Sequence, residues 1–190
     1  MRSIGGEYQK RYYCHPIDLR QLPSLPSLES CRGLRHDVPT LIISECCLCY
    51  LDVDTARDIV KWFGDKIPDL GIVLYEPIGV GDAFGQMMVE NLAARGIAMP
   101  TVQRYKTLSD QTERLADFGF KANGGKGGSN AETIDNIWKK WISDNERERV
   151  DGLEGLDEVE EWQMLARHYA VVWGWKEGNA WDGWRRHPVE

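Results

Sequence analysis

Two uninterrupted apolar runs are the clearest features of the hydrophobic pattern. Residues 39–45 read PTLIISE, with no polar alternation until their end, and residues 71–76 read GIVLYE. Such runs are typical of strands that are buried on both faces of a parallel sheet. Between them, residues 54–66 carry apolar side chains at the spacing i, i+3, i+4 and i+7, namely Ala56, Ile59, Val60 and Phe63. Strand, helix and strand with short connections predict a right-handed βαβ unit and an α/β fold.

The rest of the pattern predicts further elements around this unit. Apolar positions at helical spacing predict two more helices, over residues 83–95 and 109–118. Ser129 and Glu132 form a capping-box pattern that predicts a helix over residues 131–141. The charged residues 143–161 are expected to form a solvated loop that runs into a helix. Short apolar or aromatic runs predict three more strands, over residues 12–17, 118–122 and 168–175.

Composition and charge narrow the class of protein. The chain has 190 residues, 42% of them hydrophobic, which fits one globular domain over residues 1–190. Its net charge of −7 argues against binding to nucleic acid or to an anionic membrane, both of which need clustered Lys and Arg. No apolar run approaches the roughly 20 residues that span a bilayer. The odd number of cysteines and an N-terminus unlike a signal peptide predict a cytoplasmic protein.

Three of the five cysteines crowd one apolar segment, at Cys46, Cys47 and Cys49. A structural zinc site needs a second pair of ligands at a suitable spacing, and none follows in the sequence. Neighbouring residues of an extended segment also point to opposite sides. The cluster is therefore interpreted as buried small apolar side chains, with no metal site and no cysteine nucleophile.

A glycine-rich stretch at residues 124–129 has some likeness to a phosphate-binding loop. Such a loop requires Ser or Thr directly after its lysine, whereas Lys126 is followed by Gly127. The stretch is therefore interpreted as a turn.

Acidic residues stand at the ends of three predicted strands, at Asp18, Glu45 and Glu76. In open α/β sheets the ligand crevice lies outside the carboxyl ends of the strands, where carboxylates accept hydrogen bonds from a nucleoside. The alternative is that these residues simply begin solvated loops. Position alone leaves both interpretations open.

Three stretches, taken together, resemble one family. They are YCHPIDLR at residues 13–20, LIISECCLCYL at 41–51, and YEPI at 75–78 followed by GDAFGQMM at 81–88 and ENL at 90–92. They are similar to motifs of the leucine carboxyl methyltransferases, and weaker similarity continues to Trp173. The resemblance implies a class I S-adenosylmethionine-dependent methyltransferase with a Rossmann-like α/β fold.

The resemblance also implies an activity and a set of site residues. The expected reaction is methyl-esterification of the C-terminal leucine carboxylate of the type 2A protein phosphatase catalytic subunit, with S-adenosylmethionine as cofactor. Asp18 would accept from the adenine amino group, the Leu19 N–H would face the ring, and Glu45 would lie beside the cofactor. Tyr50 would be the catalytic residue near the methyl group, and residues 84–92 would wall the substrate pocket. In-line transfer to a carboxylate needs positioning and desolvation rather than a general base.

The resemblance covers only the C-terminal part of the family domain. The family's first strand with its glycine-rich cofactor loop, its second strand with a ribose-binding acid, and an arginine for the substrate carboxylate have no counterpart here. Without a first strand, residues 41–44 are expected to present an apolar, unpaired edge. We therefore expect a truncated chain that is inactive alone. The alternatives are a noncatalytic module that binds the phosphatase or another protein, and an unrelated nucleotide-binding domain, for which no phosphate loop is found.

Overall fold

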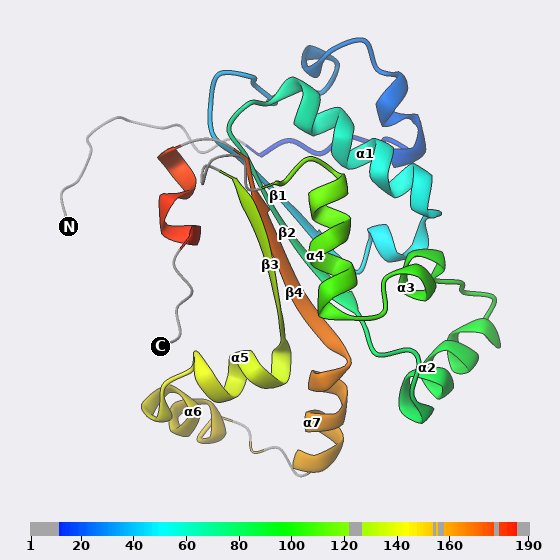
Figure 1. Cartoon of the computed structure of the whole chain (residues 1–190), viewed down its shortest axis with the longest axis vertical. Coiled ribbons are helices and arrows are strands. Elements are labelled where there is room, and N and C mark those ends of the chain that lie inside the picture. The colour runs from blue at the N-terminus through cyan, green and yellow to red at the C-terminus, as the bar shows by residue number, and fades with distance from the viewer. Residues whose placement is uncertain (1–11, 122–126, 154, 156–157, 177–178, 186–190) are drawn as a thin grey trace.

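The computed structural model describes residues 12–121, 127–153, 155, 158–176 and 179–185. A four-stranded mixed sheet runs through it in the order β1-β2-β4-β3 (Figure 1). The strands are β1 (Thr40–Glu45), β2 (Leu70–Pro77), β3 (Gly128–Thr133) and β4 (Tyr169–Trp175). β1 and β2 are parallel, and β4 is antiparallel to both of its neighbours. The carboxyl ends of β1, β2 and β3 therefore lie at the same end of the sheet.

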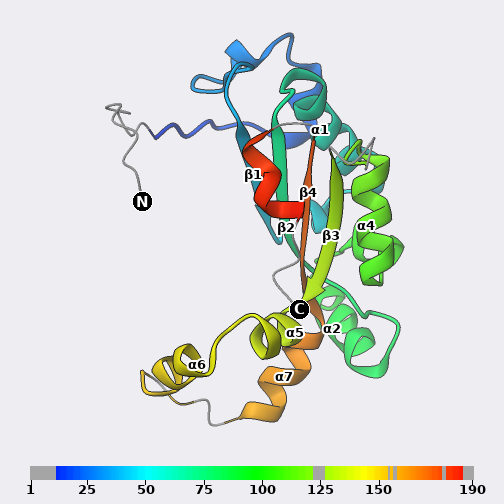
Figure 2. The ribbon, with the colours of Figure 1, turned by 60° about the vertical axis from the view of Figure 1, so that its left-hand side comes forward.

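Helices cover one face of the sheet and extend beyond its carboxyl end. The α-helices are α1 (Val53–Lys66), α2 (Ala83–Ala93), α3 (Pro100–Arg104), α4 (Leu108–Asp117), α5 (Ile134–Lys140), α6 (Asp144–Asp151) and α7 (Val159–Arg167). Four 3₁₀ turns add η1 (Leu19–Ser24), η2 (Leu28–Ser30), η3 (Leu48–Tyr50) and η4 (Asn179–Arg185). α1 and α4 pack on one face, and η4 lies against the other (Figure 2). None of these helices is long and apolar enough to cross a bilayer.

The predicted βαβ unit is confirmed. In β2, the core-facing side chains of Leu70, Ile72 and Leu74 are fully buried. They pack against the apolar face of α1, where Ile59 and Val60 are also buried. The start of α1 is fixed because the Asp52 carboxylate accepts a hydrogen bond of 2.9 Å from the Thr55 N–H. Burial of this apolar face is the main stabilising contribution to the unit.

β1 is an edge strand of the described sheet, because it pairs with β2 alone. Its outward side chains Leu41 and Ile43 are 42% and 72% exposed. The expected apolar, unpaired edge is therefore confirmed. The prediction that residues 39–45 are buried on both faces is wrong for the described residues, because no strand and no helix covers that side of β1.

Several predicted elements differ from the structure. Residues 12–17 form no strand, since no neighbouring strand offers them hydrogen bonds. Residues 118–121 form a turn and coil, and residue 122 lies outside the described residues. β3 occupies the predicted start of the helix at 131–141, because pairing with β4 outweighs the local capping signal of Ser129. Within 143–161, the predicted loop is the helix α6, which is capped by Ser143.

Candidate functional site

The carboxyl ends of β1 and β2 position the candidate site. Directly after Glu45, Cys46 adopts a φ of 41°, the only positive φ of a non-glycine residue among those described. Its backbone N–H donates to the Tyr75 carbonyl over 2.9 Å, so the turn is anchored to β2. A left-handed conformation at a residue with a Cβ is costly and persists where the surroundings impose it. This turn leads the chain into η3 and places Tyr50 beside the strand ends.

Three tyrosines gather at this end of the sheet. Tyr75 and Tyr169 stack with ring centroids 5.2 Å apart, and Tyr50 is 46% exposed. Burial raises the pKa of Tyr169, and the nearby Cys46, Tyr75 and Tyr50 side chains raise it further. Burial also raises the pKa of Tyr50. Both phenols are therefore protonated at neutral pH and available as hydrogen-bond donors.

A cavity of about 300 Å³ opens between α2 and Tyr169. Its lining is mainly apolar and includes one guanidinium, the residues being Phe84, Met87, Met88, Asn91, Leu92, Arg95 and Tyr169. Apolar walls with few polar groups are typical of small-ligand pockets. Arg95 is exposed and makes no salt bridge with any described residue. The cavity could therefore hold an apolar group that carries a negative charge.

Asp82 and His168 hold α2 in place. The Asp82 carboxylate caps α2 by accepting from the Gly85 N–H over 2.8 Å. The same carboxylate lies 3.0 Å from Nε2 of His168, at the start of β4, and His168 Nδ1 donates to the Met164 carbonyl over 2.8 Å. Gly85 cannot carry a side chain here, because a Cβ would come within 2.4 Å of the Gly79 carbonyl oxygen. These contacts fix the cavity wall relative to Tyr169.

Glu76 does not face the crevice. Its carboxylate pairs with the Arg114 guanidinium of α4, and both side chains are fully buried on the core face of the sheet. Its place at a strand end therefore serves packing rather than ligand binding. The sequence gives no local sign of this partner, which is 38 positions away.

Asp18 and Leu19 lie apart from Glu45 and Tyr50. The Asp18 carboxylate caps η1 and pairs with Arg20, which lowers the pKa of Asp18. Figures 1 and 2 show the chain from residue 12 to η1 crossing the end of the sheet where β1 and β2 begin. Glu45 ends β1 at the opposite end. The structure thus brings Glu45 and Tyr50 together without Asp18 and Leu19, whose cofactor contacts stay a prediction.

The cysteine cluster is only partly buried. Cys49 is buried, and burial is the first cause that raises the pKa of its thiol to about 12. Cys46 is partly buried and Cys47 is exposed, so the prediction of three buried side chains holds for Cys49 alone. Over the described ranges, no group of three His, Cys, Asp or Glu side chains could hold a metal ion. Residues 124–126 of the glycine-rich stretch lie outside the described residues.

Comparisons with known proteins place the chain beside one group of enzymes. No protein-family profile matches it. Leucine carboxyl methyltransferase 1 of Aspergillus fumigatus is 42% identical over 201 residues, which cover 92% of this chain and 49% of that protein. The Yarrowia lipolytica protein of the same name is 43% identical over 88% of this chain and 49% of its own length. An Arabidopsis thaliana homologue is 34% identical over 89% and 49%. The chain spans about half the length of these relatives.

Solved structures support the fold alone. A candidate methyltransferase from Thermobifida fusca aligns with a TM-score of 0.53 at 13% identity, over 85% of this chain and 53% of that one. The α/β fold of the Rossmann-like methyltransferase type, inferred from the sequence, is thereby confirmed over the part of it that the chain spans.

Proposed function

Because the chain belongs to the leucine carboxyl methyltransferase family, over about half the length of its curated relatives, we propose that it serves methyl-esterification of a C-terminal leucine carboxylate. The proposed methyl donor is S-adenosylmethionine. The proposed substrate is the catalytic subunit of type 2A protein phosphatase.

The cavity beside α2 is the observation that carries this proposal. Its walls of Phe84, Met87 and Leu92 suit a leucine side chain, and Arg95 offers a partner for the free carboxylate. Tyr169 joins the cavity to Tyr75, which it stacks on at the strand end. A leucine seated here would thus bring its carboxylate toward the carboxyl ends of β1 and β2.

The chemistry asks little more of the protein than orientation. When bound, S-adenosylmethionine supplies a methyl group on a sulfonium, which is already a good electrophile. A carboxylate is already a nucleophile at neutral pH, so this chain needs no general base. Tyr50 keeps its proton and would donate a hydrogen bond to one carboxylate oxygen, leaving the other oxygen free to attack. Partial burial between α2 and Tyr169 would strip water from the nucleophile.

Only part of the proposed cofactor site is assembled. Glu45 is exposed and forms no salt bridge with any described residue. Its carboxylate is therefore free to accept a hydrogen bond from a nucleoside. Asp18 and Leu19 would contact the adenine only if their segment lay at the carboxyl end of β1. This separation favours one second candidate function, a noncatalytic module that binds the phosphatase through the cavity.

Methyl transfer to a peptide tests the proposal. The purified chain would be incubated with labelled S-adenosylmethionine and a peptide ending in leucine, with the same peptide amidated at its C-terminus as control. Transfer to the free acid only, with an increased KM in Arg95→Gln, supports the enzyme and contradicts the expectation that this chain is inactive alone. Peptide binding that depends on Arg95, without methyl transfer or cofactor binding, supports the binding module instead. Equal binding of the acid and the amide contradicts both.

A further inference from the structure

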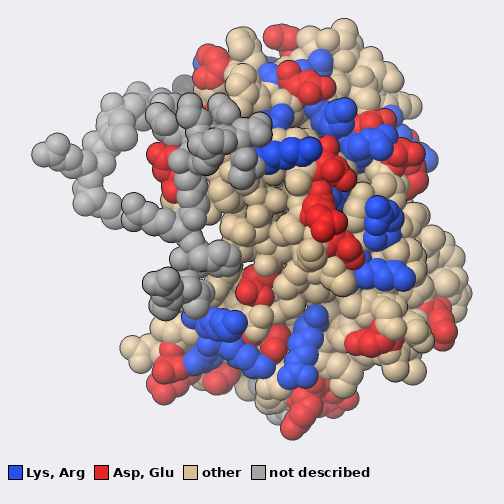
Figure 3. Space-filling view, viewed as in Figure 1, with Lys and Arg blue, Asp and Glu red and all other residues tan. Residues whose placement is uncertain are grey.

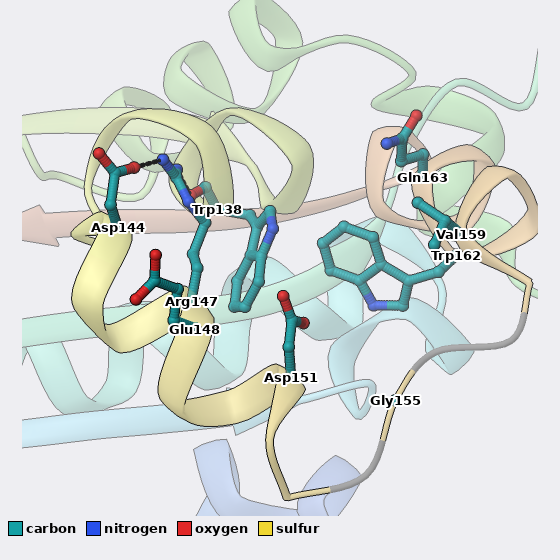
Figure 4. Close-up of a pocket in the computed structure, with 9 residues that line it drawn as sticks. All are labelled: Trp138, Asp144, Arg147, Glu148, Asp151, Gly155, Val159, Trp162 and Gln163. Carbon is teal, nitrogen blue, oxygen red and sulfur yellow. Dashed lines mark hydrogen bonds and ion pairs between the residues drawn. The ribbon is translucent and has the colours of Figure 1, made fainter.

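A second and larger cavity lies within the helices α5, α6 and α7. Its volume is about 600 Å³, and Figure 4 shows the side chains that line it. None of them belongs to the site described above. These helices are inserted between β3 and β4, and β3 ends where β1 and β2 end. The cavity therefore lies beyond the end of the sheet at which the α2 cavity also opens.

Two tryptophans form an aromatic corner in this cavity. Trp138 of α5 and Trp162 of α7 meet edge to face, with ring centroids 5.5 Å apart and an angle of 69° between the rings. Both indoles are partly exposed rather than enclosed in the core. An indole face attracts a cation more strongly than any other side-chain ring, and two crossed rings can contact one cation from two sides.

The charge around this corner is negative. Arg147 of α6 donates to the carbonyls of Trp138 and Lys139 of α5, each over 3.0 Å, which ties α6 to α5. Its charge is also engaged within α6, by an ion pair with Asp144. Glu148 and Asp151 also line the cavity, and neither forms an ion pair with any other described residue. Figure 4 shows the Asp151 carboxylate directed toward the gap beside the two indoles.

The surrounding sequence reinforces this charge. Residues 144–161 contain nine Asp or Glu and two Arg, a net charge of −7 that equals the net charge of the whole chain. Figure 3 shows acidic side chains at the lower end of the molecule, where α6 and α7 lie, with basic side chains beside them. The negative electrostatic potential of residues 144–161 attracts cations to this segment.

We propose that the corner formed by Trp138, Trp162 and Asp151 binds an alkylammonium group, with Glu148 strengthening the negative field. The cavity volume leaves room for the aliphatic stem of such a group beside Val159. A lysine or N-methylated lysine side chain of a protein carries this chemistry, and so does a free quaternary amine. The site is independent of the α2 cavity and of the proposed methyl transfer.

Titration of the full chain by indole ¹⁵N NMR tests the proposal. Choline is the charged probe, and 3,3-dimethyl-1-butanol is its neutral isostere; Trp138→Phe and Trp162→Phe assign the two indole signals. Choline should shift both signals saturably, and the isostere should bind at least about fivefold more weakly, since only the charge differs. Asp151→Asn should weaken choline about threefold to tenfold and leave the isostere unchanged.

The controls separate this site from general charge effects. Glu90→Gln removes an exposed carboxylate on α2, outside the cavity, and should leave the affinity for choline unchanged. Replacing choline with a blocked lysine and a blocked trimethyllysine identifies the source: tighter binding of either indicates a protein side chain, and tighter binding of choline a free amine. Equal affinity for choline and its isostere, or no saturable shift of these two indoles, overturns the proposal.

Discussion

The Glu76 carboxylate at the end of β2 pairs with the Arg114 guanidinium of α4, and neither side chain is exposed to solvent. Gln111 accepts a further hydrogen bond of 3.1 Å from Arg114. The guanidinium also lies over the ring of Tyr105, 5.0 Å from its centroid. The pair therefore fastens α4 to the strand that leads into the candidate site.

Glu76→Gln should destabilise the protein strongly. The substitution leaves the Arg114 charge buried without a counter-charge, which costs about 3–5 kcal/mol of the free energy of unfolding. Urea unfolding followed by tryptophan fluorescence measures this loss. Arg149→Gln, which breaks the exposed pair with Glu146 on α6, is the matched control and should leave the urea midpoint almost unchanged. If the two substitutions lowered the urea midpoint equally, burial of the Glu76–Arg114 pair would not contribute to the free energy of unfolding.

Asp82→Asn should lower the stability of the protein to urea, by an amount that depends on pH, because the Asp82 carboxylate holds α2 in place. The Gly85 N–H and then His168 hold the pKa of Asp82 below its ordinary value of 3.8. An acid with a lowered pKa stabilises the fold above its ordinary pKa, and this contribution is lost as the pH falls through the lowered value. The urea midpoints of the two proteins should therefore differ near neutral pH and converge as the pH falls below 3.8. A difference that is constant over this range would contradict the assigned role.

Cys49 should resist alkylation in the folded protein. Its side chain is fully buried and its thiol pKa is raised to about 12, so almost no thiolate forms at neutral pH. Cys14 is exposed and should react first. Brief treatment with iodoacetamide followed by peptide mass spectrometry measures both sites, with the urea-unfolded chain as the reference. If Cys49 were labelled as fast as Cys14 in the folded protein, Cys49 would be a reactive cysteine, and the inertness inferred from its burial would be wrong.

The unpaired edge of β1 predicts that the chain self-associates, and Ile43→Lys should reduce this association. Ile43 is 72% exposed on β1, which has an unpaired edge within the described sheet. A lysine at an edge strand opposes pairing with another chain. Sedimentation velocity over a range of concentrations measures the effect. Leu153→Lys is the matched control, since Leu153 is also 72% exposed but lies outside the sheet. If both substitutions reduce association equally, the edge of β1 is not the contact.

The elements predicted correctly are those whose pattern matches their final surroundings. β1 pairs with β2 as its apolar run predicts, although Leu41 and Ile43 stay exposed. The apolar run of β2 and the periodic face of α1 pack against each other, so for these two elements the local pattern and the fold agree. Residues 12–17 have the composition of a strand, but a strand also requires a partner. The helix that the capping pattern at Ser129 predicts does not begin there, because residues 128–133 pair with β4 instead. No local pattern in the sequence reveals this pairing.

The candidate site could be predicted only in part. The resemblance placed Tyr50 and residues 84–92 near a ligand crevice, and the structure brings them to the same end of the sheet. The partner of Glu76 and the aromatic corner of Trp138 and Trp162 depend on tertiary packing between separate helices. No spacing in the sequence identifies them, since the residues are brought together only by the fold.

Calorimetric titration of the purified chain with S-adenosylmethionine tests the central claim most directly, with S-adenosylhomocysteine as a second ligand. The account predicts saturable binding that is weakened at least about tenfold by Glu45→Ala, since the substitution removes a carboxylate beside the cofactor. A parallel loss in Asp18→Ala would show that this segment reaches the adenine. Absence of binding by a chain shown to be folded by circular dichroism, or binding that is unaffected by Glu45→Ala, would contradict the proposed cofactor site.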